Sequence, residues 1–383
     1  MIYLDNAATT PVRREALEAM WPHLTGSFGN PSSHHRIGEA ARAALTDARR
    51  TVAGVLGCRP GDVVFTSGGT EADNLAIKGL ALGNPRGHHL VTAPIEHEAV
   101  LESVAYLRRV HGFEVTMLPV DATGRVDPAD LARVIRPDTT LVTVQYANNE
   151  VGTVQPLAEL SAVAREHGVP FHTDAVQAAG WLPLDVMALG VDALSLSGHK
   201  VGAPPGSGVL FVRGRYPLEP VLHGGGQERG KRSGTENVAG AVALATALRL
   251  AELERTDAAT RTTGLREALI AGVLAGVPLA QLTGHPAHRL PGTASFVFPG
   301  TSGEAVLLEL ERRGIVCSSG SACAAGSDEA SHVLTALGLS VEVAQTAVRF
   351  TLAATTTADD VTEAVASVRM AVDSVARLGA NQS

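Results

Sequence analysis

Lys200 is placed where an amine could react with an aldehyde cofactor. It ends the segment SLSGHK at residues 195–200, which closes an apolar run at 191–196 and precedes a turn rich in glycine and proline. The apolar run predicts a strand, and open α/β sheets build their sites at strand ends. An amine held there can form a Schiff base if its surroundings lower its pKa. A lysine alone is as easily an exposed loop residue, so the interpretation depends on its companions.

A candidate phosphate site lies at residues 66–71 (TSGGTE), where small residues follow a predicted strand and open a predicted helix. The backbone around Gly69, the hydroxyl of Thr70 and the positive end of the helix would together attract a phosphate. Thr70 could instead be an ordinary helix N-cap, with the glycines serving only the turn. A phosphate site in the same half of the chain as Lys200 favours pyridoxal phosphate as the cofactor.

Three further strand ends carry polar side chains that would suit this cofactor. Asp174 could pair with the protonated pyridine nitrogen, and Gln177 could donate to the phenolate oxygen of the ring. A helix cap is an equally good interpretation of Asp174. His97 could stack on the ring or move protons, although a lone histidine is more often a packed or surface residue. The side-chain amides of Asn148 and Asn149 follow the third of these strands.

The second half of the chain holds two more candidate groups. Arg349 lies in an apolar strand pattern, and burying it requires either an internal carboxylate or the carboxylate of a bound amino acid. Cys323 lies in a small-residue segment that predicts a mobile loop, so its thiol could enter a site and withdraw. It could also be an inert turn residue. Cys317 and Cys58 are expected to be buried and structural.

The elements that would position these residues alternate between strands and helices. Apolar runs predict strands at residues 63–66, 90–93, 141–145, 169–172, 193–196 and 208–212. Helical periodicity predicts helices between them, such as 71–82 and 157–167. This alternation predicts an α/β fold with a mostly parallel, doubly wound sheet covered by helices on both faces. The carboxyl ends of the strands would gather the polar groups at one rim.

A smaller α+β domain is expected after the sheet. Residues 239–250 predict a long helix, followed after Thr256 and Asp257 by a second helix that ends near Val277. Strands are expected at 293–298 and 347–351, and helices at 303–312 and 357–378. We therefore expect a large cofactor-binding domain at residues 15–255 and a small domain formed by residues 1–14 and 256–383, which carries the Cys323 loop.

The composition excludes several classes of protein. Hydrophobic residues make up 45% and charged residues 18% of the 383 residues, which disfavours wholesale disorder. A formal net charge of −8 disfavours binding of nucleic acid through phosphate neutralisation. No apolar stretch reaches the roughly 18 residues of a membrane helix and the first residues carry no secretory pattern, so we expect a soluble cytoplasmic protein. Three cysteines neither form a disulfide framework nor complete a zinc site.

Together these segments resemble the pyridoxal-phosphate-dependent cysteine desulfurases of aminotransferase class V, in the group with the loop motif SSGSAC. The likeness covers essentially the whole chain. It is carried by YLDNAATTP (3–11), FGNPS (28–32), TSGGTE (66–71), EH (96–97), NNEVG (148–152), HTDAVQ (172–177), SGHK (197–200), GGGQERG (224–230), RSGT (232–235), SSGSAC (318–323) and VRF (348–350). The resemblance implies a fold-type-I homodimer that releases sulfur from L-cysteine as a persulfide and leaves L-alanine.

The resemblance also implies how the cofactor would be held. Lys200 would bind it covalently and move protons, and His97 would stack on its ring and assist proton transfer. Asp174 would pair with the pyridinium, and Gln177 with the phenolate oxygen. The phosphate would be held by Gly69, Thr70, Ser197 and His199, and by Thr235 of the neighbouring subunit.

Three residues would handle the substrate under the same resemblance. Asn149 and Arg349 would grip its carboxylate, and Cys323 would take its sulfur and deliver it to an acceptor protein such as an iron-sulfur scaffold, or to tRNA thiolation or thio-cofactor synthesis. No resident metal is expected, although Cys323 could lend a ligand to a cluster in transit. The alternatives that stay open are a class V aminotransferase, a selenocysteine lyase, and a sulfur relay that only accepts persulfide and binds no chromophore.

Overall fold

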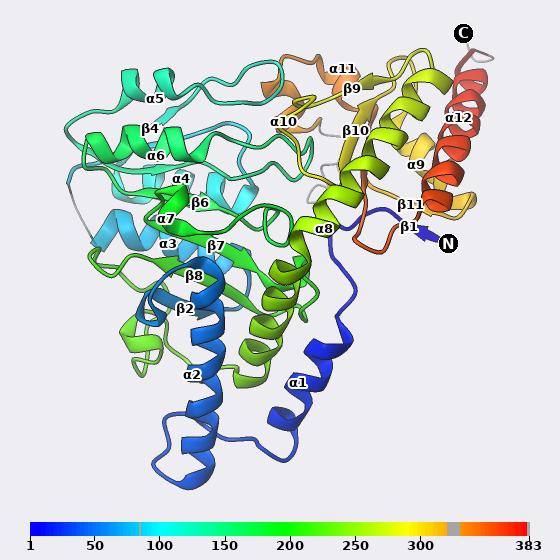
Figure 1. The fold of residues 1–383 in the computed structure, drawn as a ribbon. Coiled ribbons are helices and arrows are strands. Elements are labelled where there is room, and N and C mark those ends of the chain that lie inside the picture. Colours follow the sequence, from blue (N-terminus) through cyan, green and yellow to red (C-terminus); the bar gives the residue numbers. More distant parts are fainter. Residues whose placement is uncertain (84–85, 320–329, 381–383) are drawn as a thin grey trace.

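The computed structural model describes residues 1–83, 86–319 and 330–380, with side chains to residue 377. A seven-stranded sheet lies at the centre of its larger part (Figure 1). The strands are β2 (Val63–Thr66), β3 (His89–Thr92), β4 (Glu114–Met117), β5 (Thr139–Thr143), β6 (Phe171–Asp174), β7 (Ala193–Ser197) and β8 (Gly208–Val212). Their order is β2-β8-β7-β6-β5-β3-β4, and within this sheet β8 alone runs opposite to the other six strands. The predicted fold class is therefore confirmed.

Helices cover both faces of this sheet. They are α1 (Arg14–Leu24), α2 (Arg36–Leu56), α3 (Gly69–Gly83), α4 (Glu98–His111), α5 (Pro128–Val134), α6 (Leu157–Glu166), α7 (Val186–Leu189) and α8 (Val238–Gly276). Successive strand residues point to opposite faces, so Val63 and Val64 enter different apolar cores. One core joins the sheet to α3 and α4, and the other joins it to α2, α6 and the first part of α8.

The fully buried strands were predictable and the exposed edge strand β4 was not. The predicted strands at 63–66 and 208–212 coincide with β2 and β8, whose residues are buried throughout. β4 lies at the edge of the sheet, and its residues are exposed or half-buried. It therefore lacks the continuous apolar run by which a buried parallel strand is recognised.

The predicted break in the long helix is wrong. One helix, α8, runs without interruption through Thr256 and Asp257. Threonine and aspartate are weak helix formers, but they remove no backbone hydrogen bond and cost well under about 1 kcal/mol each. Packing outweighs that cost, because α8 contacts α1 and α2 with its first half and α12 (Ala358–Ala380) with its second half.

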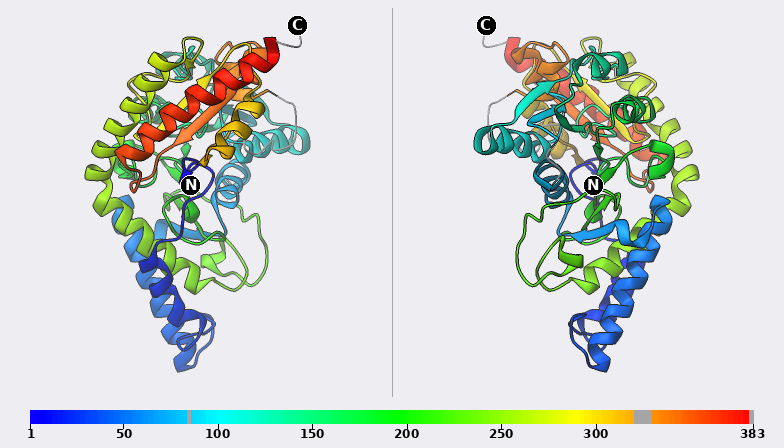
Figure 2. Two further views of the ribbon diagram at one scale, coloured as in Figure 1. Left: turned by 90° about the vertical axis from the view of Figure 1, so that its right-hand side faces the viewer. Right: turned by 90° about the vertical axis from the view of Figure 1, so that its left-hand side faces the viewer.

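A second, smaller part of the molecule contains the first residues of the chain and the C-terminal helix α12 (Figures 1 and 2). It contains the sheet β12-β10-β9, formed by β12 (Ala347–Thr351), β10 (Thr293–Val297) and β9 (Gln281–Leu282). The N-terminal strand β1 (Ile2–Tyr3) pairs in parallel with β11 (Ile315–Val316). The helices here are α9 (Gly303–Arg312), α10 (His332–Ala336), α11 (Val341–Ala344) and α12. Among the described helices, none has the length and apolar character to cross a membrane.

Candidate active site

A cavity of about 610 Å³ opens at the carboxyl ends of β5, β6 and β7, where parallel strands place their following loops. Most of the predicted site residues line it: Gly69, Thr70, His97, Asn149, Asp174, Gln177, Ser197, His199, Lys200 and Arg349. Thr235 is exposed and does not line this cavity. Cys323 lies outside the described residues. The sheet topology thus brings together groups that are up to 280 residues apart in the sequence, from Gly69 to Arg349.

Lys200 ends a single 3-10 turn, Gly198–Lys200, that follows β7 directly. Its Nζ donates to the carbonyl oxygens of Ala7 and Ala8, the latter at 2.7 Å. Burial, followed by the nearby Lys200 charge, lowers the pKa of His199 to about 4, so this imidazole is neutral at pH 7. The N-terminal segment is therefore part of the site. The sequence did not predict the contact of this segment with Lys200, because the segment makes it through two backbone carbonyl oxygens and no side chain.

Asp174 ends β6 with its side chain buried. Burial raises the pKa of this carboxyl, while the neighbouring His97 and Lys200 favour its charged form. Its Oδ1 accepts a hydrogen bond from the backbone N–H of Val176 at 2.8 Å. The residues that follow form turns, so Asp174 caps no helix. Gln177, three residues on, donates from Nε2 to the carbonyl of Ala7 at 3.1 Å.

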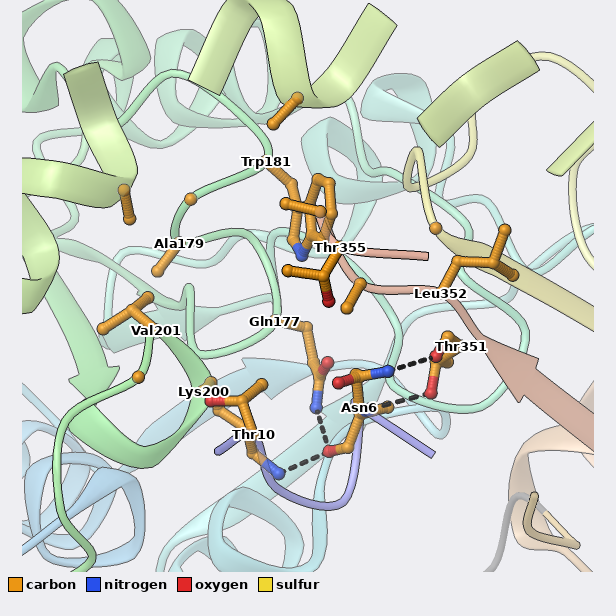
Figure 3. A pocket seen from close by; sticks show the side chains of 18 of the residues that line it. Asn6, Thr10, Gln177, Ala179, Trp181, Lys200, Val201, Thr351, Leu352 and Thr355 are labelled. Carbon is orange, nitrogen blue, oxygen red and sulfur yellow. Dashed lines mark hydrogen bonds between the residues drawn. The ribbon is translucent and has the colours of Figure 1, made fainter. Parts of the chain in front are cut away.

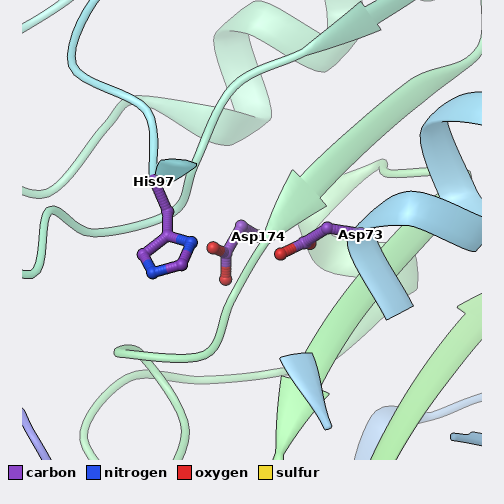
Figure 4. A group of neighbouring side chains, drawn as sticks. All are labelled: Asp73, His97 and Asp174. Atoms are coloured by element: carbon purple, nitrogen blue, oxygen red, sulfur yellow. The ribbon is translucent and has the colours of Figure 1, made fainter. Parts of the chain in front are cut away.

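His97 is the N-cap of α4, and its Nδ1 accepts from the backbone N–H of Ala99 at 3.1 Å. This bond fixes the ring beside Asp174. Figure 4 shows Asp174 between His97 and a third side chain, Asp73 of α3, and atoms of all three lie within 4.8 Å of one another. The sequence prediction missed Asp73. The signal that could have predicted it is an acidic residue on the buried face of α3, the helix that follows the candidate phosphate-binding turn.

The first turn of α3 forms the cradle that a phosphate would need. The helix begins at Gly69, so Thr70 lies inside its first turn and is not the N-cap. A Cβ on Gly69 would lie 2.8 Å from Cγ2 of Val176 and 3.5 Å from Cβ of Ser197, so this position has no room for a side chain. A helix start has unpaired N–H groups, and the hydroxyls of Thr70 and Ser197 lie beside them, so the chemistry of this turn suits an anion.

Taken together, these residues fit pyridoxal phosphate. The cavity offers an amine for its aldehyde, an anion cradle for its phosphate, a buried carboxyl for its ring nitrogen and an imidazole beside the ring position.

Arg349 lies in the middle of β12 and is almost fully buried, at 2% exposure. Its Nη2 donates to Oδ1 of Asp5 at 2.7 Å, and its Nη1 donates to the carbonyl of Asn149 at 2.9 Å. Of the two alternatives predicted for Arg349, an internal carboxylate or that of a bound amino acid, the internal one is present and is supplied by Asp5 of the N-terminal segment. Arg349 also lines the cavity, so the internal ion pair does not remove it from the site.

Cys58 and Cys317 are half-buried, not fully buried as predicted. Burial, followed by the charge of Asp62, raises the pKa of the Cys58 thiol to about 12. Burial also raises the pKa of the Cys317 thiol, with Asp5 adding to the shift. Both thiols stay protonated at neutral pH, which fits the structural role predicted for them.

A second cavity, of about 440 Å³, adjoins the first (Figure 3). Ala7, Gln177 and Lys200 line both cavities. The wall of the second cavity also includes Trp181 and Leu352.

The chain matches the Aminotransferase class-V family over residues 2–363. It is 46% identical to the cysteine desulfurase IscS of Dictyoglomus turgidum, over 94% of this chain and 91% of that protein. It is also 46% identical to the IscS-like cysteine desulfurase of Mycobacterium tuberculosis, over 95% of this chain and 94% of that protein.

Solved structures with the same fold include a NifS-like protein and SspA. A NifS-like protein has a TM-score of 0.90 and 37% identity, over 96% of this chain and 98% of that one. SspA in complex with cysteine has a TM-score of 0.80 and 38% identity, over 92% of this chain and 99% of that one.

Proposed function

The chain belongs to the aminotransferase class-V family and is a pyridoxal-phosphate-dependent cysteine desulfurase, and we propose that the cavity at the carboxyl edge of the sheet is its active site. The observation that supports this site is the convergence of Lys200, Asp174 and His97 on one cavity. The substrate we propose is L-cysteine and the carbon product is L-alanine. SspA, a structural relative, is named as a complex with cysteine, which supports this choice.

We infer a division of labour among the residues that would hold the cofactor. When bound, pyridoxal phosphate supplies an electron sink that weakens bonds at the substrate's α and β carbons. Asp174 would keep the ring nitrogen protonated, and Gln177 would donate to the phenolate oxygen. His97 would lie on the ring face. The phosphate would be held by Gly69, Thr70, Ser197 and His199, and by Thr235 of a second subunit.

Two side chains would move protons. Lys200 would bind the cofactor aldehyde and, once displaced by the substrate amine, carry a proton between substrate carbons. His97 would serve as the second proton carrier, since its Nδ1 is committed to the Ala99 N–H and its Nε2 is the remaining ring nitrogen.

Asn149 and Arg349 would bind the substrate carboxylate. A guanidinium presents paired N–H groups that match a carboxylate, and Asp5 holds this one in place through Nη2.

Cys323 is proposed as the sulfur acceptor. Its thiolate would attack the substrate sulfur, the Cβ–S bond would break, and the electron pair of that bond would take up a proton at Cβ. Overall, L-cysteine and the Cys323 thiol become L-alanine and a Cys323 persulfide, so no external oxidant is required. The persulfide would pass to an acceptor such as an iron-sulfur scaffold, or to tRNA thiolation or thio-cofactor synthesis.

We also propose the setting in which this chemistry takes place. The protein would act as a homodimer in the cytoplasm, where a reducing environment preserves a reactive thiol. The chain would be divided into a large domain (15–255) that contains Lys200 and a small domain (1–14 and 256–383) that contains Arg349. The continuous helix α8 would connect the two.

Two experiments test this proposal. Borohydride reduction followed by mass spectrometry should place a pyridoxyl group on Lys200, and its location elsewhere would contradict the proposed site. Cys323→Ser should abolish persulfide formation while the protein keeps its bound chromophore. Unchanged alanine production by that variant would favour another class V activity, and a colourless native protein would favour a sulfur relay.

A further inference from the structure

A layer of polar side chains lies between the central strands and α3. Thr143, His172 and Ser195 stand on neighbouring strands, with Thr143 paired in register with His172. The hydroxyl of Thr143 lies 2.8 Å from Nδ1 of His172, and Nε2 of His172 lies 3.0 Å from the hydroxyl of Ser195. All three side chains are buried, on the face of the sheet that packs against α3. Asp174 points to the same face, two residues after His172.

Asp73 completes this layer from the side of α3. Its side chain is 1% exposed, and burial raises the pKa of its carboxyl group while the nearby Ser195 hydroxyl lowers it. Its Oδ1 is buried without a hydrogen-bond partner among the described residues, and lies 3.7 Å from Nε2 of His172. On its other side is the carboxyl group of Asp174 (Figure 4). Burying a polar atom without a partner costs free energy, so we expect a proton between the carboxyl groups of Asp73 and Asp174.

The charges around the two carboxyl groups decide which one carries that proton. Asp174 faces His97 and Lys200, which favour its ionised form. Asp73 faces Asp174 and the buried Glu96, which oppose ionisation in addition to burial itself. His172 cannot balance a second negative charge, because burial lowers its pKa to about 3 and it is neutral at pH 7. Two neighbouring buried carboxyl groups do not both ionise.

We propose that Asp73 is a positioning residue for Asp174: it keeps a proton, joins Asp174 to the polar layer beneath α3, and leaves Asp174 as the single negative charge facing the cofactor ring. The proposal rests on the proposed role of Asp174. It assigns Asp73 a neutral, hydrogen-bonding function, which an asparagine can supply and a leucine of similar size cannot.

The test compares Asp73→Asn with Asp73→Leu. Cofactor-free protein is titrated with pyridoxal phosphate to obtain its affinity, and the absorbance band of the loaded protein is followed against pH. D73N should keep both the affinity, within about twofold, and the midpoint of the pH profile. D73L should weaken the affinity about tenfold, the loss expected when buried groups lose a hydrogen-bond partner, and should move the midpoint. The melting temperature of each cofactor-free variant checks its fold.

Two results would overturn the inference. If D73N weakens binding as strongly as D73L, Asp73 is ionised in the native protein. If neither variant changes affinity or midpoint, Asp73 has no positioning role. His172→Gln tests the inference even if both Asp73 variants fail to fold. If Asp73 and His172 form an ion pair, H172Q should lose affinity for pyridoxal phosphate tenfold or more. If the layer is neutral, the loss of affinity should be at most about threefold. Asp174→Asn separates the two proposals, since an unchanged affinity there would refute the role of Asp174 itself.

Discussion

The two ends of the cavity are built in different ways. The end that includes Lys200 and Asp174, which we call the cofactor end, takes its groups from successive strand ends of one sheet, where burial dominates and raises the pKa of Asp174. The end that includes Arg349 and Asn149, which we call the substrate end, is held by an ion pair between Asp5 and Arg349, 344 residues apart. The sheet topology positions the groups of the cofactor end, and a contact between residues far apart in the sequence positions those of the substrate end.

This contrast suggests a division between chemistry and recognition. Buried carboxyl groups with few opposite charges are expensive to form, and they are retained where a cofactor needs a defined charge. The substrate end instead depends on the N-terminal segment, which also contacts Lys200 through the carbonyls of Ala7 and Ala8. Residues 5–8 therefore touch both ends. Changes at the cofactor end should affect turnover, and changes at the substrate end should affect substrate affinity.

The largest effect is expected from Lys200→Ala. Removing the amine takes away both the covalent attachment of the cofactor and a proton carrier, so alanine production should fall at least about a thousandfold. The measurement is initial-rate formation of alanine from cysteine, with the absorbance spectrum of the purified protein. Lys78→Ala, on the far part of α3, is the matched control and should retain activity. A covalently bound cofactor in K200A would contradict the assignment.

Arg349→Lys should produce the largest change at the substrate end. A lysine keeps the charge but cannot make paired hydrogen bonds to a carboxylate, so KM for cysteine should rise about 30-fold while kcat changes less. Arg312→Lys, an exposed arginine of α9, is the control. If kcat falls and KM is unchanged, Arg349 acts at the cofactor end and the proposed distinction between the two ends is wrong.

The sequence was most informative where one physical effect dominates. Buried strands and amphipathic helices produce strong patterns, so β12 and α9 coincide with their predicted ranges. The position of the polar groups at the ends of β5, β6 and β7 could be predicted for the same reason, because these strands were recognised from their apolar runs. The choice between their alternative roles came from the resemblance, because an aspartate that binds a cofactor and one that caps a helix look the same in sequence.

What the sequence could not predict depends on tertiary contacts. The continuity of α8 is decided by packing against helices from both parts of the chain. The contact between Lys200 and Ala7 involves backbone atoms, which carry no residue signature. Asp5 satisfies the expected need of Arg349 for a carboxylate, but the choice among 39 acidic side chains required the fold.

Asp5→Asn should destabilise the protein more than the loss of an exposed ion pair does. The guanidinium of Arg349 is buried, so losing its charged partner should lower the free energy of unfolding by about 3 kcal/mol. Glu18→Gln, which removes the exposed pair with Arg14, is the control and should cause no measurable change. The measurement is urea denaturation at pH 7. Equal effects of the two substitutions would show that the substrate end does not depend on its internal ion pair.

The smallest effect, and the most specific to the cofactor end, concerns the pH dependence of stability. The folded-state pKa of His172 is lowered from 6.5 to about 3, so between these values the unfolded chain binds more protons at this residue than the native one. The contribution of His172 to stability is therefore present above pH 6.5 and is lost as the pH falls, by about 2 kcal/mol at pH 5.

Asp73 and Glu96 change the stability with pH in the direction opposite to His172. The contribution of His172 can therefore be measured only by comparing the native protein with a variant. Burial raises the pKa of both carboxyl groups well above their usual values, so above about pH 4 the native state binds more protons there, and their contribution grows as the pH falls. The net pH dependence of the native protein mixes both signs. His172→Gln removes one of them, so its loss of stability between pH 7 and pH 5 should be about 2 kcal/mol smaller than that of the native protein in paired urea titrations. Parallel curves for the two proteins would mean that His172 takes up a proton in the fold as readily as in the unfolded chain, and it would then not be a neutral buried group.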